Sequence, residues 1–178
     1  PMTVSIAIAG AAGRMGLSLL RAAAADERLR VTGGSERPDS QAIGADLGVL
    51  AEAGASGFAI SSTVAEAAKG AQVWIDFTQP TAALAVLASL EGTEIKAVVL
   101  GTTGFSAEQE AIIEACSNRY AIVYSGNFSL GVNVLAGLVR QAAARLGTDW
   151  DIEITEAHHR RKVDAPSGTA IMLGQAAA

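Results

Sequence analysis

The stretch "VSIAIAGAAGRMGLSLLRAAAADERL", Val4 to Leu29, gives the clearest indication of the fold. A short apolar run is joined to an alanine- and leucine-rich segment by the glycine-rich turn "GAAGRMG", Gly10 to Gly16. The apolar run is typical of a buried strand, and the longer segment carries its charges at helical spacing. A strand, a glycine-rich turn and a helix in this order predict the first unit of an α/β fold.

The same alternation continues along the chain. Further strands are predicted over 30–36, 71–78, 95–104 and 120–127, and further helices over 63–70, 81–92 and 106–118. The predicted strands are nearly continuous in apolar character, as a parallel sheet covered by helices on both faces requires. The sequence therefore predicts a Rossmann-like, doubly wound parallel sheet.

The pattern changes after Phe128. A long helix is predicted over 130–147, and a strand over 149–157 follows it. We expect a domain boundary near this point, so that residues 1–128 form one domain and residues 129–178 begin a second, α+β domain.

Composition limits the class of protein. The 178 residues are 50% hydrophobic and carry a net charge of -5, so a sizeable core and no nucleic-acid partner are expected. Cys116 is the only cysteine, which excludes an intrachain disulfide and a multi-thiolate metal site. The start of the chain is typical of a strand and not of a signal peptide, and no run approaches the roughly 18 apolar residues of a membrane span. We expect a cytoplasmic protein that binds neither membrane nor metal.

The turn "GAAGRMG" has a possible chemical role. A phosphate can approach the backbone where side chains are absent, and the N–H groups at a helix start then bind it. Gly10 and Gly13 suit this close approach, and Gly16 suits packing of the helix. The spacing G-x-x-G-x-x-G differs from the commonest dinucleotide motif, so a ligand-free turn is an equally open interpretation.

An acid follows the second predicted strand, about 20 residues after the turn. Glu36 could accept hydrogen bonds from the hydroxyl groups of an adenosine ribose, and Arg37 could pair with a 2′-phosphate. Together they suggest a site for NADH or NADPH. A solvated surface loop is the alternative.

Two later strand ends carry loops of small and hydroxyl residues. These are "GTTG", Gly101 to Gly104, and "SGNF", Ser125 to Phe128. Ligands of open parallel sheets bind outside the carboxyl ends of the strands, so both loops could line a nicotinamide ring. Ordinary turn chemistry is the alternative for each.

The run "EAHHRRKVDAPSGTA", Glu156 to Ala170, contains both histidines of the chain. Lys162 offers a cation, and the "SGT" triplet could present hydroxyl and N–H groups at a helix start. Two anion sites suggest a substrate with two carboxylates, and one histidine could donate a proton while the other holds the substrate. Alternatively, the histidines form a surface pair and the two arginines are solvated or paired with acids.

The motifs "GAAGRMG", "GTTG", "NFSLGVN" and "EAHHRRKVDAPSGTA" resemble those of the dihydrodipicolinate reductase family, and the resemblance runs the length of the chain. It implies a Rossmann-type domain that binds NADH or NADPH. It also implies a second domain that binds a cyclic dicarboxylate and forms a homotetramer. The implied activity is reduction of 4-hydroxy-tetrahydrodipicolinate to tetrahydrodipicolinate in lysine and diaminopimelate biosynthesis.

The resemblance also implies roles for individual residues. His158 corresponds to the proton donor and Lys162 to a second catalytic group. The implied cofactor-binding residues are Gly10, Ala11, Ala12, Gly13, Arg14, Met15, Glu36, Arg37, Gly101, Thr102, Thr103, Ser125, Gly126, Asn127 and Phe128. The implied substrate-binding residues are His159, Lys162, Ser167, Gly168 and Thr169.

The chain departs from the family in one respect, because members continue well beyond the helix expected at Gly168. We therefore expect much of the second domain, and most tetramer contacts, to be missing from these 178 residues. Two rival functions are a nucleotide-sensing module without catalysis and a dehydrogenase acting on an aspartate-derived aldehyde. Neither accounts for the run from Glu156 to Ala170.

Overall fold

The computed structural model describes residues 3–158, 160 and 165–178. The chain divides into two compact units, Pro1–Tyr124 and Ser125–Ala178. Each unit is described by itself.

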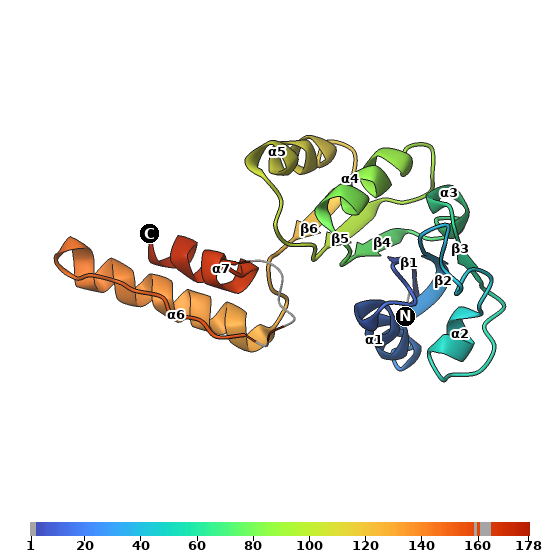
Figure 1. Cartoon of the computed structure of the whole chain (residues 1–178), viewed down its shortest axis with the longest axis horizontal. Coiled ribbons are helices and arrows are strands. Elements are labelled where there is room, and N and C mark those ends of the chain that lie inside the picture. The colour runs from blue at the N-terminus through green and yellow to red at the C-terminus, as the bar shows by residue number, and fades with distance from the viewer. Residues whose placement is uncertain (1–2, 159, 161–164) are drawn as a thin grey trace. The chain divides into compact units, whose positions relative to one another are not determined.

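The first unit is built on one six-stranded parallel sheet (Figure 1). Its strands are β1 (Val4–Ala9), β2 (Leu29–Ser35), β3 (Ile60–Ser61), β4 (Val73–Asp76), β5 (Ala97–Leu100) and β6 (Ala121–Tyr124). Their order in the sheet is β3-β2-β1-β4-β5-β6, which is the order of a doubly wound Rossmann sheet. The predicted fold class is confirmed.

Helices cover both faces of this sheet, because strands such as β1 present apolar side chains on both faces. Its alternate residues Ile6 and Ile8 belong to a core cluster with Leu20 of α1, whereas Ala7 and Ala9 belong to a second cluster around Trp74. The covering helices are α1 (Arg14–Ala24), α2 (Leu47–Leu50), α3 (Val64–Ala67), α4 (Pro80–Ser89) and α5 (Ala107–Cys116). Helices α1 and α2 pack on the face of the first cluster, and α3, α4 and α5 pack on the other.

The helix ends follow local sequence signals. Ser106 caps α5 and forms a capping box with Gln109. Two short elements were not predicted, α2 and the two-residue strand β3. Asp46 stabilises the start of α2 by accepting hydrogen bonds from the N–H groups of Gly48 and Val49. Elements this short span too few residues to show a hydrophobic period.

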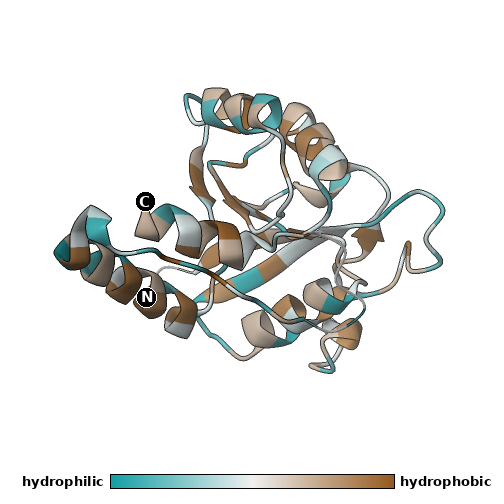
Figure 2. Cartoon of the chain, turned by 60° about the vertical axis from the view of Figure 1, so that its left-hand side comes forward, coloured by the Kyte–Doolittle hydropathy of each residue, from teal (hydrophilic) through white to brown (hydrophobic). Residues whose placement is uncertain are grey.

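The second unit contains α6 (Leu130–Leu146), the 3₁₀ turn η1 (Gly147–Asp149) and α7 (Gly168–Ala177). Helices α6 and α7 lie side by side within it, and Figure 2 shows apolar residues along α6. Among the described residues, no helix is long and apolar enough to cross a membrane.

The predicted strand over 149–157 is wrong. Residues 151–157 have no regular secondary structure, and the apolar side chains Trp150, Ile152 and Ile154 are exposed. A strand exists only where its backbone groups pair with a neighbouring strand. No described segment of the second unit is a strand that could supply this pairing.

Candidate functional site

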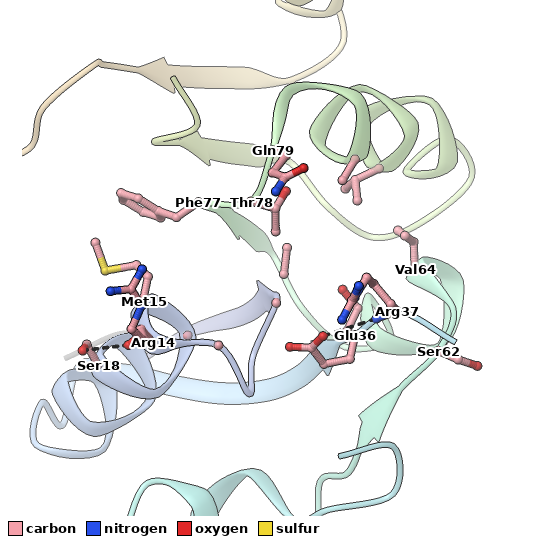
Figure 3. Close-up of a pocket in the computed structure, with 17 residues that line it drawn as sticks. Arg14, Met15, Ser18, Glu36, Arg37, Ser62, Val64, Phe77, Thr78 and Gln79 are labelled. Atoms are coloured by element: carbon pink, nitrogen blue, oxygen red, sulfur yellow. Dashed lines mark hydrogen bonds between the residues drawn. The ribbon is translucent and has the colours of Figure 1, made fainter. Parts of the chain in front are cut away.

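A cavity of about 980 Å³ lies at the carboxyl ends of β1, β2 and β4 in the first unit (Figure 3). We call it the strand-end cavity. Its volume suits a cofactor-sized ligand. Its lining residues are Ala9, Gly10, Gly13, Arg14, Met15, Gly16, Ser18, Ser35, Glu36, Arg37, Ser62, Val64, Phe77, Thr78, Gln79, Ala82 and Val86.

The glycine-rich turn forms the floor of the cavity, and its shape depends on glycine. Gly10 has φ +61°, a left-handed conformation that favours glycine. The N–H of Gly13 then donates to the Gly10 carbonyl oxygen at 2.9 Å. A Cβ atom on Gly16 would lie 2.2 Å from the Gly10 carbonyl oxygen, so helix α1 can approach the turn this closely only with glycine at that position.

Helix α1 begins at Arg14, directly beside the cavity. No side chain caps its first turn, and that turn contains no acidic residue. The backbone N–H groups at a helix start carry partial positive charge and need acceptors. This end of the cavity is therefore suited to an anion such as a phosphate.

Glu36 follows β2, and its side chain is hydrogen-bonded to the glycine-rich turn. Its Oε1 accepts a hydrogen bond from the N–H of Ala12 at 3.1 Å, and its Oε2 accepts one from the N–H of Arg37 at 3.3 Å. The side chain of Arg37 is 81% exposed, and its Nε lies 3.9 Å from an Asp39 carboxylate oxygen. Both predicted residues line the cavity, and the guanidinium remains accessible to a ligand.

The loop after β5 does not line the cavity, but it packs against a residue that does. Gly101, Thr102 and Thr103 are absent from the lining, and Thr102 is buried. The ring of Phe77 packs directly on Gly101, where an added Cβ atom would lie 2.0 Å from the ring. Phe77, Thr78 and Gln79 line the cavity but were not predicted, although the rule about the carboxyl ends of parallel strands applies equally to the loop after β4.

In the second unit, the "SGNF" loop meets the start of α7. The side-chain amide of Asn127 donates to the Thr169 hydroxyl at 2.7 Å. A Cβ atom on Gly126 would lie 3.2 Å from the carbonyl oxygen of Gly168. Residues predicted for the nicotinamide side and residues predicted for the substrate are thus brought together within this unit.

Glu156 links the two halves of the run "EAHHRRKVDAPSGTA". Its Oε1 accepts a hydrogen bond from the Ser167 N–H at 2.8 Å, and its Oε2 accepts one from the Ser167 hydroxyl. Nδ1 of His158 lies 3.4 Å from the same Oε2. Ser167 is buried and caps α7 by accepting from the Ala170 N–H at 3.0 Å. Glu156 was not predicted as a site residue.

Two predicted site residues, His159 and Lys162, lie outside the described residues. Within the part of the chain that the structure does describe, no group of three or more His, Cys, Asp or Glu residues could hold a metal ion.

The strand order, the glycine-rich turn and the acid after β2 define a Rossmann-type α/β protein. The chain belongs to the dihydrodipicolinate reductase family. The family described as "Dihydrodipicolinate reductase, N-terminus" matches residues 4–128, and "Dihydrodipicolinate reductase, C-terminus" matches residues 131–178.

Curated relatives are similar along almost the whole chain. It is 47% identical over 171 residues to a 4-hydroxy-tetrahydrodipicolinate reductase of Bradyrhizobium diazoefficiens, covering 96% of this chain and 63% of the relative. It is 49% identical over 173 residues to one of Methylocella silvestris, covering 97% of this chain and 63% of the relative. The chain therefore spans just under two thirds of the length of these relatives.

A solved structure has the same fold. The dihydrodipicolinate reductase of Paenisporosarcina sp. TG-14, described as bound to dipicolinate, matches with a TM-score of 0.70 at 24% identity. The match covers 99% of this chain and 66% of that one.

Proposed function

We propose that this protein reduces 4-hydroxy-tetrahydrodipicolinate to tetrahydrodipicolinate with NADH or NADPH. The observation that carries the proposal is the strand-end cavity, where an uncapped helix start and the Glu36 carboxylate both line the wall in a chain of this family. Both relatives named above are 4-hydroxy-tetrahydrodipicolinate reductases.

The residues of the cavity fit a dinucleotide. Gly10 and Gly13 line the cavity next to the uncapped start of α1 and have no side chains, so a pyrophosphate would fit against the backbone there. The Glu36 carboxylate would accept from the adenosine ribose hydroxyls, since each of its oxygens can accept a further hydrogen bond. A bound nicotinamide would supply the hydride that the reduction needs.

The second unit would hold the substrate. The N–H groups at the start of α7, at Gly168 and Thr169, suit one carboxylate, and the family resemblance assigns Lys162 and His159 to substrate contacts. Because Nδ1 of His158 faces Glu156, its Nε2 would carry the proton for the substrate. The reaction forms a ring C–H bond, breaks the C–O bond to the hydroxyl group and, with this proton, releases water.

The family resemblance also supports a homotetramer in the cytoplasm as the working form. The lysine and diaminopimelate pathway supplies the substrate in this account, and the partner is a small cyclic dicarboxylate.

Replacing Arg37 with alanine is expected to raise the Kd for NADPH about tenfold or more and to leave the Kd for NADH within about twofold. The guanidinium would donate charge-assisted hydrogen bonds to the 2′-phosphate, which NADH lacks. Fluorescence titration of both cofactors measures the change. Arg119→Ala is the matched control, because Arg119 pairs with Glu91 and does not line the cavity. Equal weakening of both cofactors would contradict this role for Arg37.

The reaction is tested by following NADPH oxidation at 340 nm with the purified protein. The substrate is formed in place by a synthase acting on pyruvate and aspartate semialdehyde. We expect turnover that disappears when the synthase is omitted. Binding of NADPH without turnover would contradict the reductase activity of these 178 residues and favour a nucleotide-binding module.

A further inference from the structure

Asp76, the last residue of β4, is an acid buried beside the strand-end cavity. The residue is 1% exposed, and it does not line the cavity. Its Oδ1 accepts hydrogen bonds from the Thr78 N–H at 2.8 Å, the Thr78 hydroxyl at 2.6 Å and the Thr102 hydroxyl at 3.3 Å. One carboxylate oxygen thus connects the loop after β4 to the loop after β5.

The backbone strengthens this connection. The N–H of Gly101 donates to the Asp76 carbonyl oxygen at 2.8 Å, and Asp76 pairs with Leu100 in the sheet. The ring of Phe77 then packs on Gly101, as described above. Phe77 and Thr78, which line the cavity, therefore have positions that depend on Asp76.

The free-energy cost of burying the Asp76 carboxylate indicates that this residue does more than fill space in the core. Burying a carboxylate is unfavourable unless hydrogen bonds compensate for lost hydration. Its Oδ2 is buried and has no hydrogen-bond partner among the described residues. An apolar residue would end a buried strand without this cost, so the acid is best explained by the three hydrogen bonds that its other oxygen accepts.

The position of these two loops indicates which half of a dinucleotide cofactor would bind near them. In the sheet order, β2 and β4 flank β1 on opposite sides. Figure 3 shows Glu36 and Arg37 on one side of the glycine-rich turn, and Phe77 and Met15 on the other. A dinucleotide binds across such a crevice. With its adenosine at Glu36, its nicotinamide half would lie near the loop after β4.

We propose that Asp76 is a positioning residue for the nicotinamide half of the cofactor. It holds Phe77 and Thr78 in place from behind the cavity and does not touch the cofactor itself. This inference rests on the proposed function, because it requires that the cavity bind a nicotinamide dinucleotide.

The test compares Asp76→Ala, Asp76→Asn and the wild-type protein by fluorescence titration with NADH and calorimetric titration with ADP. We expect Asp76→Ala to weaken NADH binding about tenfold and to change ADP binding less than about twofold, because ADP carries only the adenosine half. The Asp76→Asn variant retains a side-chain oxygen acceptor at this position, so it is expected to recover most of the NADH affinity.

Thr102→Val provides a nearly isosteric second variant should Asp76→Ala fail to fold. It removes one donor to Oδ1 and is expected to weaken NADH binding several-fold, again without an effect on ADP.

Equal weakening of NADH and ADP by these variants would overturn the inference, because a general loss of structure would weaken both. Unchanged NADH binding in Asp76→Ala would overturn it as well. Failure of the wild-type protein to bind NADH would instead contradict the proposed function itself.

Discussion

Replacing His158 with glutamine is expected to lower kcat about 100-fold or more while the Kd for NADH stays unchanged. Glutamine can form hydrogen bonds but cannot release a proton at neutral pH. His158 has one ring nitrogen toward Glu156, at 3.4 Å, which leaves Nε2 for the substrate. Steady-state kinetics in the coupled NADPH assay and fluorescence titration of NADH measure the two quantities.

Arg160→Gln is the control for this substitution, because Arg160 is a nearby, exposed residue to which we assign no role. It is expected to keep kcat within about twofold, as is usual for surface substitutions. An unchanged kcat in His158→Gln would contradict the acid role. A loss of kcat accompanied by an equal loss of NADH affinity would assign His158 to cofactor binding instead.

Replacing Gly16 with alanine is expected to abolish measurable cofactor binding and to lower the free energy of unfolding by about 1–3 kcal/mol. The new Cβ atom would lie 2.2 Å from the carbonyl oxygen of Gly10 and 2.6 Å from that of Ala11. Both are backbone atoms, so helix α1 must move away from the turn. Chemical denaturation and NADH titration measure the two effects.

Gly137→Ala is the matched control, because Gly137 also lies in a helix but has nothing within 4 Å of an added Cβ atom. It is expected to stabilise α6 by about 0.5–1 kcal/mol, since alanine favours a helix more than glycine does. Wild-type cofactor affinity in Gly16→Ala would show that the close approach of α1 to the turn is not needed for binding.

The fold of the first unit could be predicted because its signals are local. Apolar runs, glycine-rich turns and residues such as Ser106 each act within a few positions, and their alternation leaves few arrangements besides a doubly wound sheet. The same reasoning predicted that Gly10, Gly13, Glu36 and Arg37 would meet, and they line one cavity. Their roles in cofactor binding stay predictions.

The features that could not be predicted from the sequence depend on contacts between residues that are far apart in it. The segment 149–157 has the composition of a strand, but it needs a partner to become one. Nothing near Asp76 in the sequence reveals that its carboxylate is buried and reaches Thr102, 26 positions away. Glu156 and Ser167, which are joined by a hydrogen bond, are likewise 11 positions apart in the sequence.

The loop after β4 was missed for a different reason. Phe77, Thr78 and Gln79 include no glycine, so this loop lacks the pattern by which the other ligand loops were predicted. The position of a loop at the carboxyl end of a parallel strand is the more general signal. Applied evenly to every strand end, that rule would have found these residues.

Binding of the dinucleotide in the strand-end cavity can be measured residue by residue in an NMR titration of the ¹⁵N-labelled, 18.1 kDa chain with NADPH. A second cavity of about 500 Å³, lined by Gly48 and Gly54 among others, provides an internal comparison. We predict saturable shifts of the Gly10, Gly13 and Glu36 amides, with Gly48 and Gly54 unchanged. Shifts confined to Gly48 and Gly54, or no shifts at all, would contradict the account.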